Sequence, residues 1–270
     1  VVALDPTTGA ILALVSKPSY DPAALASHTQ ADVTAAWEAL NADEAEPLMN
    51  RALRGDLYPP GSVFKVVTAA AALENGLDPA AQLPAPVELD LPLTTRTLPN
   101  FGGAACSPTG TQTLADALRI SCNTAFGQLG LDLGADALRD QAEAFGFSQP
   151  LAVPMRATES SFPAEPDAPS TALSAIGQYE VRVTPLQVAM ISAAVANDGV
   201  LMRPYSVAAV RSADLEVVDE TDPEEMGRAV SPETAQILTE MMVGVVESGS
   251  GRAAQIPGVR VAGKTGTAQT

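Results

Sequence analysis

Two short apolar runs open the chain, over residues 1–5 and 10–16, and a Pro-Thr-Thr-Gly segment separates them. Two β-favouring runs joined by a turn that closes on glycine are typical of a β-hairpin. Pro and Asp then interrupt the chain up to residue 60, and within this stretch one helix is expected near 29–42, around Trp37. The pattern therefore predicts a hairpin followed by a mostly irregular connection.

The strongest helix signal covers residues 62–76. Ser62 begins an apolar stretch without internal Gly or Pro, and Gly76 ends it. Because apolar residues lie on almost every side of this helix, we expect it to be buried. Further helices are expected at 113–120, 124–133, 134–147, 184–197 and 231–248.

Other stretches carry loop or strand signals. Loops are expected at 79–110, with short strands around 87–93, and at 148–172. Strands are expected at 205–212, at 215–220 and in the final run, 259–269.

Helices thus lie between strand signals at the two ends of the chain, which predicts a mixed α/β (α+β) fold with a sheet closed by both termini. We expect one domain over 1–270, with sheet parts at 1–20 and 200–270 and a mainly helical part at 60–200. The chain starts in a strand-like run without Met and stops inside another. It is therefore expected to be a fragment, truncated at both ends.

The composition indicates a folded domain with an acidic surface. Hydrophobic residues make up 46% of the chain and charged residues 17%, so a sizeable core can form. The net charge of −17 argues against nucleic acid and against an anionic membrane face as partners, because both attract Lys and Arg patches. No His/Cys/Asp cluster has metal-ligand spacing, so no metal or cofactor is implied. The one histidine, His28, lies in a polar helix-start context typical of a surface residue.

Ser62 and Lys65 form a candidate nucleophilic pair. Three residues apart on a helix, their side chains share one face, and Ser62 lies at the end where free N–H groups favour negative charge. A lysine in so apolar a helix should have its pKa lowered by desolvation, and it can then activate the serine hydroxyl. Alone, the pattern is a weak signal and is more often that of a capping serine beside a surface lysine.

The chain contains few lysines, which makes the Ser62–Lys65 spacing more informative. The chain has three lysines, Lys17, Lys65 and Lys264, and the last begins a Lys-Thr-Gly-Thr segment. A glycine in a strand often marks the close approach of a ligand, and Lys and Thr side chains suit a substrate carboxylate. The alternative is an edge strand with an ordinary glycine.

A polar break, Ser121-Cys122-Asn123, separates two predicted helices. Such a turn can direct a hydroxyl and an amide into one cavity, although a capping break is an equally good explanation. The two cysteines, Cys106 and Cys122, lie 16 residues apart, and their number alone leaves a free pair and a disulfide open.

In this order, the SxxK, SxN and KTG motifs resemble those of penicillin-binding proteins and serine β-lactamases. The runs ALDPTTGAILALVSKPSYDP, NRALRGDLYPPGSVFK, GQYEVRVTPLQVAMISAAVANDG and VAGKTGTAQ extend the likeness over nearly the whole chain. They resemble class B transpeptidase domains, in particular the actinobacterial PbpA-like group. The resemblance implies an antiparallel central sheet flanked by helices, with an all-helical subdomain, and the last strands of the family fold are missing here.

The resemblance also implies roles for the motif residues. Ser62 attacks the D-Ala-D-Ala carbonyl of a peptidoglycan stem peptide, Lys65 accepts its proton, and Ser121 relays protons to the leaving group. Binding of the substrate falls to Asn123, Lys264, Thr265, Gly266 and Thr267. The N–H groups of Ser62 and Thr267 would form the oxyanion hole.

By the same resemblance, β-lactam antibiotics inhibit the enzyme and a glycan synthase in the membrane is a partner. The domain is expected on the extracytoplasmic face of a bacterial cell membrane, with its anchor outside this chain. In that oxidising setting a Cys106–Cys122 disulfide becomes the favoured state.

Three other functions use the same residues. A D,D-carboxypeptidase differs only in using water as the acceptor, and a β-lactam-sensing receptor acylates without useful turnover. A class A β-lactamase needs a Glu with an Asn four residues later, and neither Glu159 nor Glu165 of the 148–172 loop has one. A D,D-transpeptidase is the function that we expect.

Overall fold

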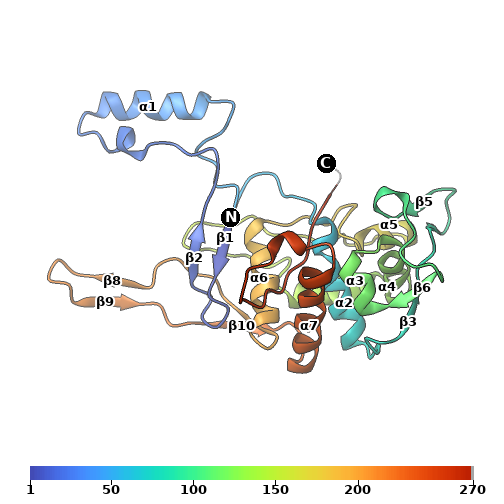
Figure 1. Ribbon diagram of the computed structural model, residues 1–270. Helices are drawn as coiled ribbons and strands as arrows, with labels where there is room; N and C mark the ends of the chain where they lie inside the picture. The colour runs from blue at the N-terminus through green and yellow to red at the C-terminus, as the bar shows by residue number, and fades with distance from the viewer. Residues whose placement is uncertain (269–270) are drawn as a thin grey trace.

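The apolar segment at 62–76 lies at the centre of the molecule as helix α2 (Lys65–Glu74) in the computed structural model, which describes residues 1–268 (Figure 1). Nine of its ten residues are buried, which confirms the expectation from its composition. The helix begins three residues later than expected, because a 3-10 turn, Gly61–Val63, precedes it. In that turn the Phe64 N–H bonds to the Gly61 carbonyl, three residues back.

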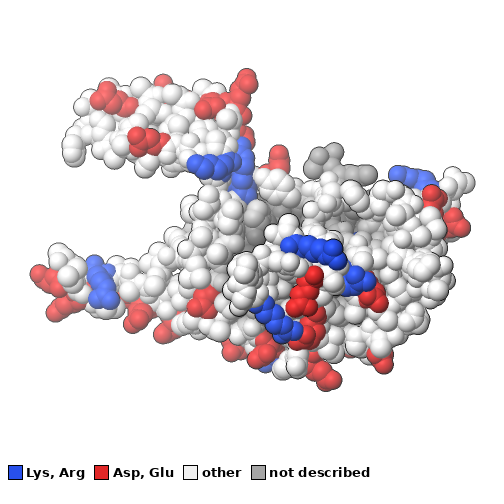
Figure 2. Space-filling model, viewed as in Figure 1, with Lys and Arg blue, Asp and Glu red and all other residues white. Residues whose placement is uncertain are grey.

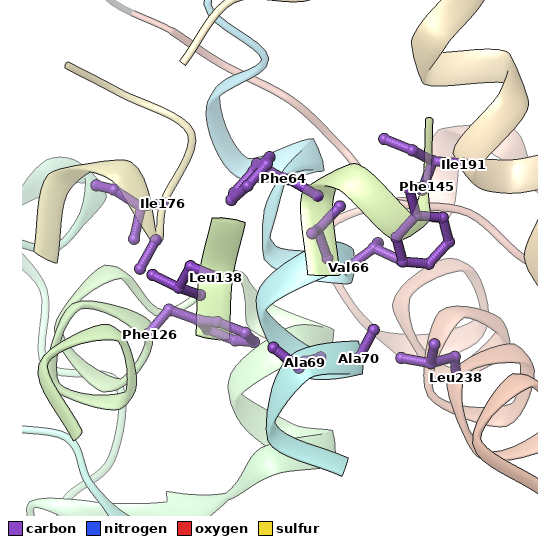
Figure 3. Close-up of a cluster of buried hydrophobic side chains, with 14 of the residues drawn as sticks. Phe64, Val66, Ala69, Ala70, Phe126, Leu138, Phe145, Ile176, Ile191 and Leu238 are labelled. Atoms are coloured by element: carbon purple, nitrogen blue, oxygen red, sulfur yellow. The ribbon is translucent and has the colours of Figure 1, made fainter. Parts of the chain in front are cut away.

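Helices surround α2 on several sides (Figures 1 and 3). Figure 3 shows Val66, Ala69 and Ala70 of α2 between Phe126, which comes from α4, and Leu238, which comes from α7. The small alanines allow the neighbouring helices to approach closely, so α2 is tightly packed at the centre of the helical part. The surrounding helices are α3 (Leu114–Ile120), α4 (Asn123–Ala144) and α7 (Pro232–Ser248), and α6 (Pro185–Ala196) packs against α7.

The helix predictions are confirmed almost throughout. Thr113, Thr184 and Ser231 cap α3, α6 and α7 by accepting a hydrogen bond from a backbone N–H three residues on. The two helices expected at 124–133 and 134–147 form α4, which Gly134 breaks with non-helical angles. One short helix was not predicted: α5 (Ala168–Ser174) lies in the segment expected as a loop, capped by the Asp167 side chain.

The strands are short and form two-stranded antiparallel sheets. The expected N-terminal hairpin is β1 (Val2–Leu4) with β2 (Ile11–Leu14), and the expected strands at 205–212 and 215–220 form β8 (Ala209–Arg211) with β9 (Val217–Glu220). The remaining pairs are β3 (Gln82–Pro84) with β6 (Thr111–Thr113), β4 (Glu88–Asp90) with β5 (Thr97–Pro99), and β7 (Val200–Met202) with β10 (Glu225–Arg228).

The mixed α/β class is confirmed, but two expectations about the sheet are wrong in detail. Residues 1–268 contain five two-stranded sheets and no single central sheet. The final run, expected as a strand over 259–269, forms no strand in its described part, and residue 269 lies outside the described residues. Its backbone has other neighbours: the Gly263 N–H bonds to the Met242 carbonyl of α7. The N-terminal hairpin does meet a later segment, at a bridge between Ala10 and Tyr205.

Two parts project from the helical body on the same side (Figure 1). One is the expected helix α1 (Gln30–Ala42) with a 3-10 turn at Pro22–Ala26, and neither contains a buried residue. The other is the β8–β9 hairpin. Figure 2 shows acidic side chains along the first projection and at the tip of the second. No helix among the described residues is both long and apolar enough to cross a membrane.

A disulfide joins Cys106 to Cys122, at a Cα–Cα distance of 5.8 Å. It ties the loop after β5 to the start of α4, where Cys122 is 2% exposed. Because it closes a 16-residue interval, the cross-link removes conformational freedom mainly from the unfolded chain.

Replacing Cys106 by alanine is therefore expected to lower the free energy of unfolding by about 3 kcal/mol. Urea denaturation of the whole protein, followed by circular dichroism, measures this change. Ala105→Ser, at the exposed neighbouring position, is the control and should leave the midpoint unchanged. Equal midpoints for wild type and Cys106→Ala would contradict the expected contribution.

Candidate active site

The Lys65 side chain lies in the first turn of α2 and is fully buried. Its Nζ donates hydrogen bonds to the Ser121 carbonyl at 2.8 Å and to Asn123 Oδ1 at 2.7 Å, with Ser121 Oγ at 3.3 Å. It also lies 5.6 Å from the ring centroid of Phe126. A buried ammonium group needs such acceptors, because its desolvation is otherwise very costly.

All of these acceptors come from the turn between α3 and α4. Ser121 ends α3 in a left-handed conformation, with φ at 62°, and its N–H and that of Cys122 bond to carbonyls of α3. Asn123 then starts α4. The sharp reversal directs the Ser121 carbonyl and the Asn123 amide at the same ammonium group. The sequence prediction that this polar break directs its side chains to one place is thus consistent with the structure.

Ser62 lies one helical turn before Lys65, in the 3-10 turn, and is partly buried. Within residues 1–268, neither its hydroxyl nor its N–H has a hydrogen-bond partner, so both are available to a reacting group. The turn is packed tightly: the Gly61 N–H donates to the Gly177 carbonyl at 2.9 Å, and the Thr267 carbonyl approaches the Gly61 Cα. Any Cβ at Gly61 would collide with that carbonyl, so the approach requires glycine.

The Lys264–Thr267 segment completes the cluster. Lys264 Nζ donates to Ser121 Oγ at 2.8 Å and to the Thr265 carbonyl at 3.0 Å. Gly266 lies against Val63 and the Pro60 carbonyl, beside the 3-10 turn. The structure therefore brings all three motifs together, although this last segment does so as an extended run without strand pairing.

Both lysines have pKa values lowered by burial, and Lys264 contributes to the shift at Lys65. Burial lowers the pKa of Lys65 well below its ordinary value, and the positive charge of Lys264 lowers it further. Burial alone lowers the pKa of Lys264 to about 8. Ser121 Oγ accepts a hydrogen bond from each amine, so its hydroxyl connects the two. An amine with a lowered pKa, one turn from a free hydroxyl, can serve as a general base for nucleophilic attack.

Several residues around the site carry no signal in the sequence. Gly177 supports the Ser62 turn, Phe126 lies beside Lys65, and Ser250 Oγ is 2.7 Å from Thr265 Oγ1. Asn100 bonds to the start of α4. Each lies far along the chain from the motif that it contacts, so only the fold reveals it. His28, in contrast, lies exposed in the α1 projection, as expected for a surface residue.

Comparisons with known proteins agree with this geometry. A family model described as the penicillin binding protein transpeptidase domain matches residues 1–270. The chain is 48% identical over its whole length to the peptidoglycan D,D-transpeptidase PbpA of Mycolicibacterium smegmatis, and it spans 55% of that protein. It thus covers little more than half the length of this curated relative.

Two solved structures are also similar. The imipenem acyl-enzyme complex of penicillin-binding protein A from Mycobacterium tuberculosis superposes with a TM-score of 0.94 at 47% identity, over 100% of this chain and 62% of that one. A structure described as showing coordination of polymerization and crosslinking by a peptidoglycan synthase complex has a TM-score of 0.82 at 29% identity, over 100% of this chain and 46% of that one.

The proximity of the two amines leads to a titration test. Lys264→Gln removes a positive charge that disfavours the ammonium form of Lys65, so the pKa of Lys65 should rise. Lys264→Arg keeps the charge and should leave that pKa nearly unchanged. The measurement is a pH titration of the Lys65 ε-carbon by ¹³C NMR, assigned by the signal that Lys65→Arg removes. An identical midpoint in Lys264→Gln and wild type would show that the charges are not coupled.

Proposed function

This chain belongs to the penicillin-binding protein transpeptidase family, and we propose on that basis that it is the catalytic domain of a peptidoglycan D,D-transpeptidase. The observation that carries the proposal is the free Ser62 hydroxyl, one turn from a fully buried lysine whose pKa is lowered. A hydroxyl nucleophile needs such a base, because its own proton is lost only with difficulty near neutral pH.

In the proposed reaction, Ser62 Oγ attacks the carbonyl carbon between the two terminal D-Ala residues of a stem peptide, and Lys65 Nζ takes its proton. The Ser62 and Thr267 N–H groups, both without a partner in the described residues, stabilise the oxyanion. The peptide bond then breaks and the terminal D-Ala leaves with a proton delivered through Ser121. The amine of a second stem peptide attacks the ester on Ser62, which forms the cross-link and restores the hydroxyl.

The remaining motif residues hold the substrate. We assign the terminal carboxylate to Lys264, Thr265, Gly266 and Thr267, because a partly buried cation beside two hydroxyls favours an anion. Asn123 would hold the side-chain amide of the stem peptide. A β-lactam carries a cyclic amide that Ser62 opens in the same way, and the similar protein from M. tuberculosis is described as forming an acyl-enzyme with imipenem.

The location and partner follow from the same family membership. A domain that cross-links peptidoglycan works outside the cytoplasmic membrane of a bacterium, where a Cys106–Cys122 disulfide is stable. The likeness to a structure described as a peptidoglycan synthase complex supports a glycan-polymerising partner.

If Ser62 is the nucleophile, Ser62→Ala should not be labelled covalently by a fluorescent penicillin. Its band should then be no brighter than the gel background. The experiment uses the whole protein, with labelled bands read after denaturing electrophoresis. Ser248→Ala, an exposed serine at the end of α7, is the control and should label like wild type. Undiminished labelling of a folded Ser62→Ala protein would remove Ser62 from the mechanism.

The group that accepts the acyl chain from Ser62, an amine or water, distinguishes the transpeptidase from its alternatives. A stem peptide ending in D-Ala-D-Ala, mixed with the protein and an acceptor amine, should give a cross-linked product and free D-Ala by mass spectrometry, and Ser62→Ala should give neither. A shortened peptide without the cross-link would indicate a carboxypeptidase. Rapid loss of the penicillin label would indicate a β-lactamase, and a stable label with no turnover of the peptide a receptor.

A further inference from the structure

The start of helix α4 lacks a cap from its own sequence. Its N-cap residue is Cys122, whose side chain makes no capping hydrogen bond and is bound in the disulfide. The first N–H groups of a helix need acceptors from outside the helix. In α4 the acceptor comes from Asn100, 23 residues earlier: Asn100 Oδ1 accepts from the N–H groups of Asn123 and Thr124, both at 3.0 Å.

Asn100 is itself held firmly in place. It directly follows β5, is 6% exposed, and its Nδ2 donates to the Val87 carbonyl at 3.2 Å. The same hairpin region receives two side chains from α4. Asn123 Nδ2 donates to the Pro99 carbonyl at 3.1 Å, and Thr124 Oγ1 donates to the Pro86 carbonyl at 2.8 Å. Asn100 therefore connects the backbone of the β4–β5 hairpin region to the first turn of α4.

This connection has a direct consequence for the site. The N–H that Asn100 holds belongs to Asn123, whose Oδ1 accepts the 2.7 Å hydrogen bond from Lys65. With its Nδ2 fixed on the Pro99 carbonyl, the Asn123 amide can present only its oxygen to Lys65. A displacement of the turn by about 1 Å would break this geometry, and displacements of that size can slow a reaction about 100-fold.

We propose that Asn100 is a positioning residue for the reaction: it caps α4 from a distant segment and thereby fixes the Ser121–Asn123 turn against Lys65. This inference rests on the proposed function. The disulfide limits how far the turn can move, but a single covalent link does not set the orientation of the Asn123 amide. Asn100 fixes the backbone from which that amide extends through two convergent hydrogen bonds, and the Pro99 carbonyl then orients the amide.

The test compares acylation rates in the whole protein. In Asn100→Ala, the rate constant for acylation by a fluorescent penicillin should fall about tenfold or more, with a smaller change in the dissociation constant of the initial complex. Asn100→Asp keeps an Oδ1 acceptor at the positive end of α4 but loses the Nδ2 donor to the Val87 carbonyl, so it should recover part of the rate. This rescue separates capping from a general loss of packing.

The control removes a comparable amide elsewhere in the same helix. Gln141 of α4 is 7% exposed and its Nε2 donates to the Ala229 carbonyl at 2.7 Å, far along the chain from the turn. Gln141→Ala should lower the melting temperature while the acylation rate of the folded protein stays near that of wild type.

Three results would overturn the inference: a folded Asn100→Ala protein that acylates like wild type, an Asn100→Asp protein no faster than Asn100→Ala, or a Gln141→Ala protein slowed as much as Asn100→Ala. If Asn100→Ala does not fold, Asn100→Asp decides alone: a loss well below tenfold supports the inference and an about tenfold loss in the folded protein overturns it. If the wild type itself takes no label on Ser62, the proposed function fails instead. The two failures are thus distinguishable.

Discussion

A lysine amine fully buried at the first turn of the apolar helix α2 is the constraint on which the rest of the site depends. An unpaired ammonium group in such a place costs several kcal/mol, whereas each hydrogen bond to a charged group returns about 1.5–3 kcal/mol. Lys65 is therefore tolerated only while the Ser121 carbonyl and Asn123 Oδ1 stay within reach. The same burial that makes these acceptors necessary also lowers the pKa of Lys65. The energetic cost of burying the amine and its proposed use as a base therefore have one cause.

The acceptors of Lys65 are held in place by parts of the chain that contain little regular secondary structure. The turn that supplies the acceptors contains Ser121 in a left-handed conformation, which a non-glycine residue adopts only when its surroundings impose it. Those surroundings are the end of α3, the disulfide at Cys122 and the Asn100 cap. The loop-rich segment between α2 and α3 thus supports the left-handed turn that supplies the acceptors of Lys65.

Much of this arrangement is predictable from the sequence, because the signals are local. Capping residues before apolar runs locate α3, α6 and α7, and the scarcity of lysine draws attention to Lys65 and Lys264. The failure at 259–269 depends on contacts between residues far apart in the sequence. The run at 259–269 has strand composition, but strand structure also needs a partner, and in its described part the Gly263 N–H bonds to a helix carbonyl instead. Helix α5 was missed although Asp167 is a capping residue, because Pro and Ser dominate its surroundings.

The same distinction explains why motifs point to the proposed reacting groups better than to the residues that position them. SxxK needs only one helical turn to place Ser62 and Lys65 on the same face, so a run of four residues suffices. Asn100 lies in a Pro- and Gly-rich loop, where asparagine is an ordinary turn residue, and no spacing relates it to Asn123. Its contribution arises only when the β4–β5 hairpin packs against α4 and places one amide oxygen between two backbone N–H groups. Because the position of the buried amine's acceptors depends on such contacts, a loop without a recognisable motif can still limit the rate of the proposed reaction.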